Sequence, residues 1–120
     1  MTKLAWLIAK EEGFFKPGTL PQRDHNPGDL RHSPHSLHDP GAPDAIGEID
    51  DDADGWADEE RQLTIYAQRG LNLEQAIYEW APPTENNSAV YLGNILSGFR
   101  GDPVTAQTPL TAVLLIPAPV

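Results

Sequence analysis

Residues 2–13 read TKLAWLIAKEEG and predict the first helix of the fold. Its apolar residues recur at the spacing of an α-helix and form one stripe, made of Leu4, Leu7 and Ile8. The hydroxyl of Thr2 can accept a hydrogen bond from a free backbone N–H at the start, and Gly13 can take the left-handed conformation that ends a helix. The sequence therefore predicts a helix from about Lys3 to Glu12.

Three further segments have helical periodicity. The helices are expected at about residues 55–69, 73–80 and 88–99. Asp54 and Asn72 are the expected caps of the first two, because their side chains can accept from free N–H groups. Gly70 and the pair Pro82–Pro83 are the expected ends of these two helices.

Between the first and second helices, residues 13–47 are rich in proline and glycine and show turn chemistry. A short hairpin is predicted around residues 45–49. Residues 105–120 are apolar and are expected to be extended, packed on the domain or at a contact surface. The predicted fold is a small, mainly α domain at residues 1–104, of α+β type, with a long loop or short hairpin between its first two helices.

Length and charge limit the classes of function. A chain of 120 residues suits one domain, and its formal net charge of −10 excludes nucleic acid as a partner, since phosphate binding needs clustered Lys and Arg. No stretch is long enough for a membrane span. The first apolar run ends after six residues at Lys10, too short for a secretory signal, so we expect synthesis in the cytoplasm without a signal peptide.

Two adjacent carboxyls close the first predicted helix. A carboxyl at a helix end beside apolar residues is partly desolvated, and desolvation raises its pKa. A general acid for glycosidic cleavage requires such a raised pKa. On a helical wheel Glu11 lies near the middle of the apolar stripe, whereas Glu12 lies at its edge, where a side chain can face both core and cleft. The alternative is that both are solvated carboxylates with a structural role.

A second group of polar residues surrounds an Asn-Pro-Gly turn. Sugar hydroxyls and acetamido groups both donate and accept hydrogen bonds, so amide, carboxylate and guanidinium side chains can bind them. The candidate sugar-binding residues here are Gln22, Arg23, Asn26, Asp29 and Arg31. The alternative is a surface turn whose Asn and Asp side chains bond to the local backbone.

Two clusters resemble metal-binding patterns. Asp50, Asp52 and Asp54 with Gly55 match the opening of a calcium loop, but the position that should hold a bidentate glutamate is Arg61. Histidines also lie close together in the loop, at His25, His32, His35 and His38. Zinc needs three or four converging ligands. We therefore expect no metal and no cofactor, with a metal-dependent binding module as a weaker alternative, and we expect the aspartates to be a solvated run that leads into the second helix.

Aromatic residues could stack on sugar rings. Trp80 shares the stripe of Leu73, Ala76 and Ile77, so we expect it in the core. Tyr66 and Tyr91 are the better candidates for the cleft, because a tyrosine hydroxyl needs a wet or polar end.

Taken together, these motifs resemble a phage and prophage family of small lysozyme-like proteins, described as peptidoglycan transglycosylases or phage structural proteins. The resemblance covers roughly residues 4–100 in order. It is carried by EGFF (12–15), PGTLPQR (17–23), NPGDLR (26–31), DGW (54–56), Gln62, YA (66–67), RGL (69–71), WAPPTENN (80–87) and Tyr91.

The resemblance implies a lysozyme-like fold and cleavage of peptidoglycan or a related amino-sugar polymer, with Glu12 as the general acid. The alternative is a non-enzymatic virion or prophage structural protein that keeps the fold and contacts other phage proteins. Either kind of protein would be virion-associated or delivered to the cell wall by another system. His25 and Asp29 depart from the family, which often has Asn at both positions, and the sequence does not identify a second catalytic group.

Overall fold

Helix α1 (Lys3–Glu12) lies at the centre of the structure, a computed structural model that describes residues 1–37 and 46–120. Thr2 caps it by accepting from the N–H of Ala5 at 3.1 Å, and Gly13 ends it with a φ of 86°. These bounds and both caps confirm the sequence prediction. The apolar stripe of α1 is buried, so this helix is surrounded by the rest of the fold.

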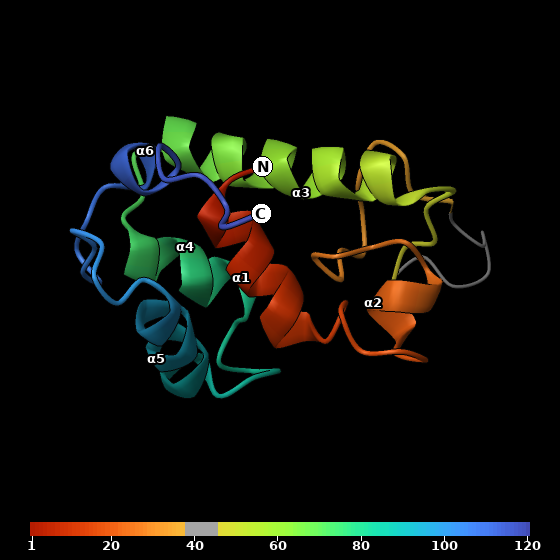
Figure 1. The fold of residues 1–120 in the computed structure, drawn as a ribbon, viewed down its shortest axis with the longest axis horizontal. Coiled ribbons are helices and arrows are strands. Elements are labelled where there is room, and N and C mark those ends of the chain that lie inside the picture. The colour runs from red at the N-terminus through yellow and green to blue at the C-terminus, as the bar shows by residue number, and fades with distance from the viewer. Residues whose placement is uncertain (38–45) are drawn as a thin grey trace.

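The other helices of the described residues pack around α1. They are α2 (Leu20–Arg23), α3 (Asp52–Gln68), α4 (Leu73–Trp80), α5 (Ser88–Gly98) and α6 (Leu110–Val113). In Figure 1, α3 runs along one side of α1 and α5 lies on the other side. Leu7 of α1 packs directly on Gly98 of α5, where a β-carbon would come within 2.4 Å of the leucine, so the glycine permits this close approach.

The prediction of a small, mainly helical domain is confirmed. Within the described residues there is no strand, and β-pairing is limited to isolated bridges. The hairpin expected at residues 45–49 is reduced to one antiparallel bridge between Leu37 and Glu48, and residues 38–45 lie outside the described part. A single core joins the helices through side chains such as Leu63, Ile77 and Phe99, each no more than 1% exposed.

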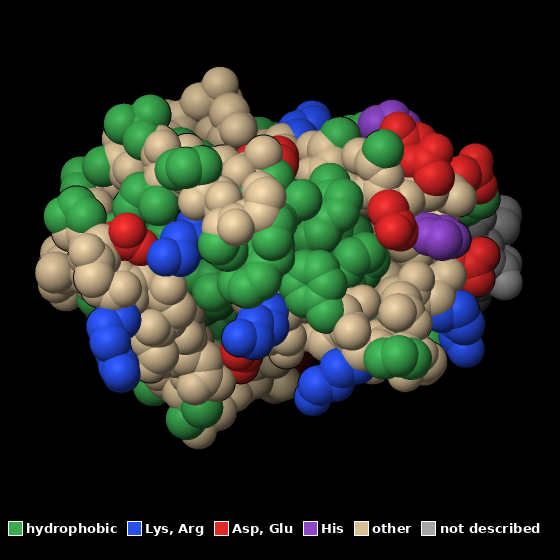
Figure 2. Space-filling view, in the orientation of Figure 1, with side chains coloured by type: hydrophobic (Ala, Val, Ile, Leu, Met, Phe, Trp, Pro, Cys, Tyr) green, Lys and Arg blue, Asp and Glu red, His purple; other side chains and the backbone are tan. Residues whose placement is uncertain are grey.

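The start of α3 differs from the prediction. The helix begins at Asp52 rather than Gly55, and its cap is Asp51, which accepts from the N–H of Asp54 at 2.9 Å. The prediction that Asp54 is the cap is therefore wrong, because the helix has already begun there. Asp52 and Asp54 lie in the first turn, where the helix dipole and free N–H groups favour negative charge. Acidic side chains gather at this end of the molecule (Figure 2).

The C-terminal segment is not extended as expected. Leu110 and Val113 form the short helix α6, and both are fully buried against the core. Pro117 then forms a bridge with Thr2, and the N–H of Ala118 donates to the carbonyl of Met1 at 3.0 Å. The two ends of the chain thus lie side by side (Figure 1). Leu110 and Val113 are three residues apart, so one helical turn directs both into the core, which an extended chain would not do.

Aromatic rings join the end of α1 to the start of α3. Phe15 lies 5.7 Å from Trp6 and 6.2 Å from Trp56, and Phe14 packs edge-on to both Phe15 and Trp56. Apolar side chains fill the middle of the face seen in Figure 2. No helix in the described ranges is long and apolar enough to cross a membrane.

Candidate functional site

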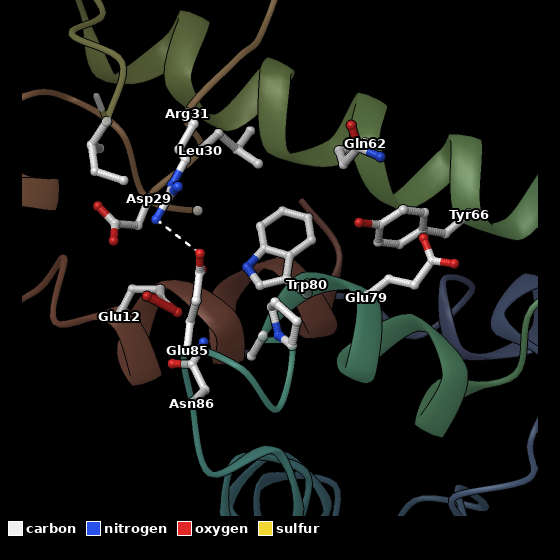
Figure 3. A pocket seen from close by; sticks show the side chains of 14 residues that line it. Glu12, Asp29, Leu30, Arg31, Gln62, Tyr66, Glu79, Trp80, Glu85 and Asn86 are labelled. Atoms are coloured by element: carbon white, nitrogen blue, oxygen red, sulfur yellow. Dashed lines mark ion pairs between the residues drawn. The ribbon is translucent and has the colours of Figure 1, made fainter. Parts of the chain in front are cut away.

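A cavity of about 520 Å³ opens where five parts of the chain meet (Figure 3). Its walls come from the end of α1, the turn at residues 28–31, Ile46, the middle of α3, and the end of α4 with the segment that follows it. The lining residues are Glu12, Gly28, Asp29, Leu30, Arg31, Ile46, Gln62, Tyr66, Glu79, Trp80, Ala81, Pro82, Glu85 and Asn86. Of the residues predicted from sequence, the structure brings Glu12, Asp29, Arg31 and Tyr66 together here.

Glu12 is the carboxyl with the most distinctive environment in this cavity. Burial raises its pKa to about 7, the charges of Asp29 and Glu11 act in the same direction, and a hydrogen bond from Tyr91 opposes them. The Tyr91 hydroxyl donates to Oε2 of Glu12 at 2.6 Å. Glu11, by contrast, is exposed, and its carboxylate accepts from Asn94. The two adjacent glutamates therefore have different environments, with Glu12 facing the cavity.

The turn that carries Asp29 is held on its interior side by Asn26, which is fully buried. The amide of Asn26 donates to the carbonyls of Leu30 at 2.7 Å and Gly47 at 2.9 Å, and its oxygen accepts from the N–H of Leu30. All these bonds lie inside the protein, and Asn26 is not part of the cavity wall. Its position therefore holds the turn in shape, whereas Asp29 and Arg31 at the rim face the cavity.

Gly28 closes the gap between this turn and α4. A β-carbon at Gly28 would lie 2.7 Å from the ring of Trp80 and 3.2 Å from Cγ of Glu59. Only a residue without a side chain fits between these neighbours. The glycine of the Asn-Pro-Gly turn is thus required by the close packing of three walls of the cavity.

Gln22 and Arg23 lie away from the cavity. The side chain of Gln22 accepts from the N–H of Gly18 at 2.9 Å, an interaction within its own loop. Arg23 is exposed, lies 3.7 Å from Asp24, and lines a separate hollow. The spacing of these two residues in the sequence suited sugar binding, but the short helix α2 directs them elsewhere.

The aromatic residues that line the cavity are not all those that the sequence predicted. Tyr66 lines the cavity as expected, and Tyr91 supports Glu12 from behind without lining it. Trp80 was expected in the core, and it packs against the core but is only partly buried, because it is the last residue of α4 and extends past the buried part of its stripe. Its ring packs edge-on to Tyr66 at 6.2 Å and forms part of the cavity wall.

Two ion pairs at the cavity were not predicted from the sequence. Arg31 lies 3.3 Å from Glu85 across the opening, drawn as a dashed line in Figure 3. Glu79 is held by Arg69 in a bidentate pair, with both contacts at 2.7 Å. Glu85 lies within the segment 80–87 that carried the family resemblance, which was the one available signal for its position.

A fully buried carboxyl lies behind the cavity. Glu59 of α3 is 0% exposed, and neither of its oxygens has a hydrogen-bond partner among the described residues. Burial raises its pKa well above the ordinary value, and the charges of Glu60 and Glu12 add to the effect. The sequence contained a signal for this burial, because Glu59 lies four residues before Leu63 and seven before Tyr66, on the face of α3 that enters the core.

Histidines fasten the loop to the start of α3. Nδ1 of His35 lies 2.6 Å from Asp58, a buried carboxylate that also accepts from the hydroxyl of Ser33 and the N–H of His35. Nδ1 of His25 lies 2.7 Å from Asp52. His38 lies outside the described residues, and in the part of the chain that is described no three His, Asp or Glu side chains converge as a metal site.

The arrangement has a definite chemical capacity. A half-buried carboxyl whose pKa lies near 7 can hold a proton at neutral pH and donate it to an oxygen of a bound ligand. The aromatic wall and the polar rim can hold a polar, ring-shaped ligand beside it. No protein-family model matches the chain, and no curated protein or solved structure is significantly similar to it.

Proposed function

We propose that the protein cleaves the glycan strand of peptidoglycan or a related amino-sugar polymer, with Glu12 as the general acid, on a lysozyme-like fold. The observation that carries this proposal is the environment of Glu12: it faces the cavity from the end of α1, and burial raises its pKa to about 7. At neutral pH about half of the molecules then carry the proton on Glu12, so a proton is available at the start of the reaction.

The proposed reaction begins with proton transfer from Glu12 to the glycosidic oxygen. The bond between that oxygen and the sugar's anomeric carbon breaks, the leaving sugar departs as an alcohol, and positive charge develops on the remaining ring. Attack by water on the anomeric carbon completes a lysozyme reaction. Attack by the sugar's own acetamido group instead gives transglycosylase chemistry. Tyr91 stabilises the carboxylate that Glu12 becomes, because its hydroxyl already donates to Oε2.

The walls of the cavity supply contacts that suit a sugar. Trp80 and Tyr66 form an aromatic wall, and Gln62 and Asn86 carry amides that both donate and accept. Of the predicted sugar-binding residues, Asp29, Arg31 and Tyr66 keep that role in the proposal. Asn26 and Tyr91 become positioning residues for the turn and for Glu12, and Gln22 and Arg23 have no part in it.

The test compares two adjacent variants, Glu12→Gln and Glu11→Gln, with the wild type. Purified cell-wall sacculi are incubated with each protein, and soluble fragments are identified by mass spectrometry. The proposal predicts fragments from the wild type and from Glu11→Gln, and none above background from Glu12→Gln. Equal release by Glu12→Gln and wild type would remove Glu12 from the reaction. Absence of fragments from the wild type would contradict the enzymatic proposal.

The second candidate is a non-enzymatic virion or prophage structural protein with the same fold. The observation in its favour is the exposed apolar end of the chain, where Leu115 is 83% and Val120 is 88% exposed. Such residues suit a contact surface. If sacculi are bound but not cut by the wild type, and Leu115→Ser abolishes assembly with a partner while leaving the fold intact, this candidate replaces the first.

A further inference from the structure

Among the charged residues that line the cavity, carboxyl groups outnumber cationic groups. Four of the lining residues carry one, namely Glu12, Asp29, Glu79 and Glu85, whereas Arg31 is the single cationic side chain among the described lining residues. The chain as a whole has a formal net charge of −10. A ligand that enters the cavity therefore meets a negative field, which attracts cationic groups and repels anionic ones.

Two of these carboxylates are neutralised by partners within the protein. Glu79 is paired with Arg69 at 2.7 Å, and Glu85 is paired with Arg31 at 3.3 Å. Glu12 is protonated below about pH 7. Asp29 is the remaining carboxyl, and it has no ion pair at contact distance among the described residues.

Asp29 lines the cavity from an unusual backbone conformation. Its φ of 52° places it in the left-handed region, which an aspartate tolerates but most residues do not. The buried amide of Asn26 holds the turn in that shape. Oδ1 of Asp29 is enclosed and has no hydrogen-bond partner among the described residues, so one oxygen of this carboxyl is left unpartnered by the protein. In Figure 3, Asp29 lies beside Glu12 at one end of the cavity.

We infer that the cavity takes a glycan in which the sugar beside Asp29 carries a free amino group, so that an ammonium group pairs with the Asp29 carboxylate. This inference rests on the proposed function and names its substrate class: a partly N-deacetylated amino-sugar strand. Only the sugar at Asp29 needs the free amine. A strand with carboxylates at this position is disfavoured, because Asp29 would repel them and Arg31 is already engaged by Glu85.

The probes are two oligosaccharides of equal length, the hexamer of glucosamine and the hexamer of N-acetylglucosamine, at pH 6, where the free amines are largely protonated. Binding is followed by titration calorimetry and by tryptophan fluorescence, to which Trp80 in the cavity wall contributes together with Trp6 and Trp56. We compare the wild type with Asp29→Asn, which keeps the shape and tolerates the left-handed backbone. Asp50→Asn is the matched control, since it removes the same charge from an exposed residue that does not line the cavity.

The wild type should bind the glucosamine hexamer about five- to tenfold more tightly than the acetylated one, a difference in the range of one partly exposed ion pair. Asp29→Asn should abolish that preference, Asp50→Asn should keep it, and added salt should reduce it.

An equal affinity of the wild type for the two hexamers, or a preference that survives Asp29→Asn, overturns the inference and leaves the proposed function standing if sacculi are still cut. Asp29-dependent binding of the glucosamine hexamer supports the inference even if no glycan is cut, which would contradict the proposed function alone. Binding of neither hexamer overturns the inference.

Discussion

Replacing Glu59 with glutamine should make the protein more stable at neutral pH. The carboxyl of Glu59 is fully buried and unpartnered among the described residues, and burial raises its pKa well above the ordinary value of 4.5. Burial therefore favours the protonated carboxyl in the folded protein, whereas the unfolded chain leaves it in water, where it ionises at its ordinary pKa. Glutamine has nearly the same shape and carries no charge in either state.

The size of the effect is set by the free energy needed to protonate the Glu59 carboxyl when the chain folds. A pH of 7 lies 2.5 units above the ordinary pKa of 4.5, and each unit corresponds to about 1.4 kcal/mol, so protonation of the carboxyl on folding costs at most about 3.4 kcal/mol. Glu59→Gln removes this cost. Both side chains bury a polar group without a partner, so that penalty is similar in the two proteins.

The sign of the pH dependence is fixed by the direction of the shift. Because the folded-state pKa is raised, the stability associated with Glu59 is fully present below pH 4.5 and is lost as pH rises toward the folded-state pKa. The advantage of Glu59→Gln should therefore grow with pH, from less than about 0.5 kcal/mol at pH 4.5 to as much as about 3 kcal/mol at pH 7.

Chemical denaturation at pH 4.5, 6 and 7, followed by circular dichroism, measures this difference in the free energy of unfolding. Glu48→Gln is the control, because Glu48 is exposed and should show no such gain. If Glu59→Gln is no more stable than the wild type at pH 7, or if its gain is the same at all three pH values, Glu59 is not a neutral buried carboxyl and the reasoning is wrong.

Two further predictions concern the hydrogen bonds of Tyr91 to Glu12 and of His35 to Asp58. Tyr91→Phe removes the hydrogen bond that lowers the pKa of Glu12, so this pKa should rise above about 7, as measured by NMR titration of side-chain carboxyl carbons; an unchanged or lower value would contradict the role given to Tyr91. The Asp58 carboxylate raises the pKa of His35, first through its hydrogen bond and then through its charge, so the stability from this pair is present below pH 6.5 and is lost as pH rises through the raised pKa. His35→Ala should therefore destabilise the protein more at pH 6 than at pH 8.5 in thermal unfolding, and an equal loss at both pH values would argue against a charged pair.

The longer helices could be predicted from sequence because the residues at their ends strongly favour the start or the end of a helix. Thr2 and Gly13 bound α1, and Asn72 with Gln75 forms a capping box at the start of α4. The start of α3 was missed because several aspartates in a row can each serve as a cap, and only the fold selects Asp51. The short helices α2 and α6 contain one turn each, too little for a periodic pattern to be recognised.

Part of the site could also be predicted, and part depended on tertiary structure. Glu12 was identified because a side chain at the edge of the apolar stripe of α1 faces both the core and the cavity. Gln22 and Arg23 were placed in the site by closeness in sequence, although a turn sends neighbouring side chains in different directions. Trp80 was assigned to the core because periodicity cannot tell where a buried face ends and a cavity begins. The burial of Glu59 was overlooked because its charge outweighed its position on the core face.

The proposed role of Glu12 is tested most directly by its pKa in the folded protein. Carboxyl-detected NMR titration between pH 3 and pH 9 gives this value, with Glu12→Gln used to assign the signal. We expect a pKa of about 7, because the cavity wall desolvates the carboxyl and Asp29 and Glu11 add negative charge nearby. A value near 4.5, the ordinary value for a solvated glutamate, would show that Glu12 is ionised at neutral pH and would contradict its role as the proton donor.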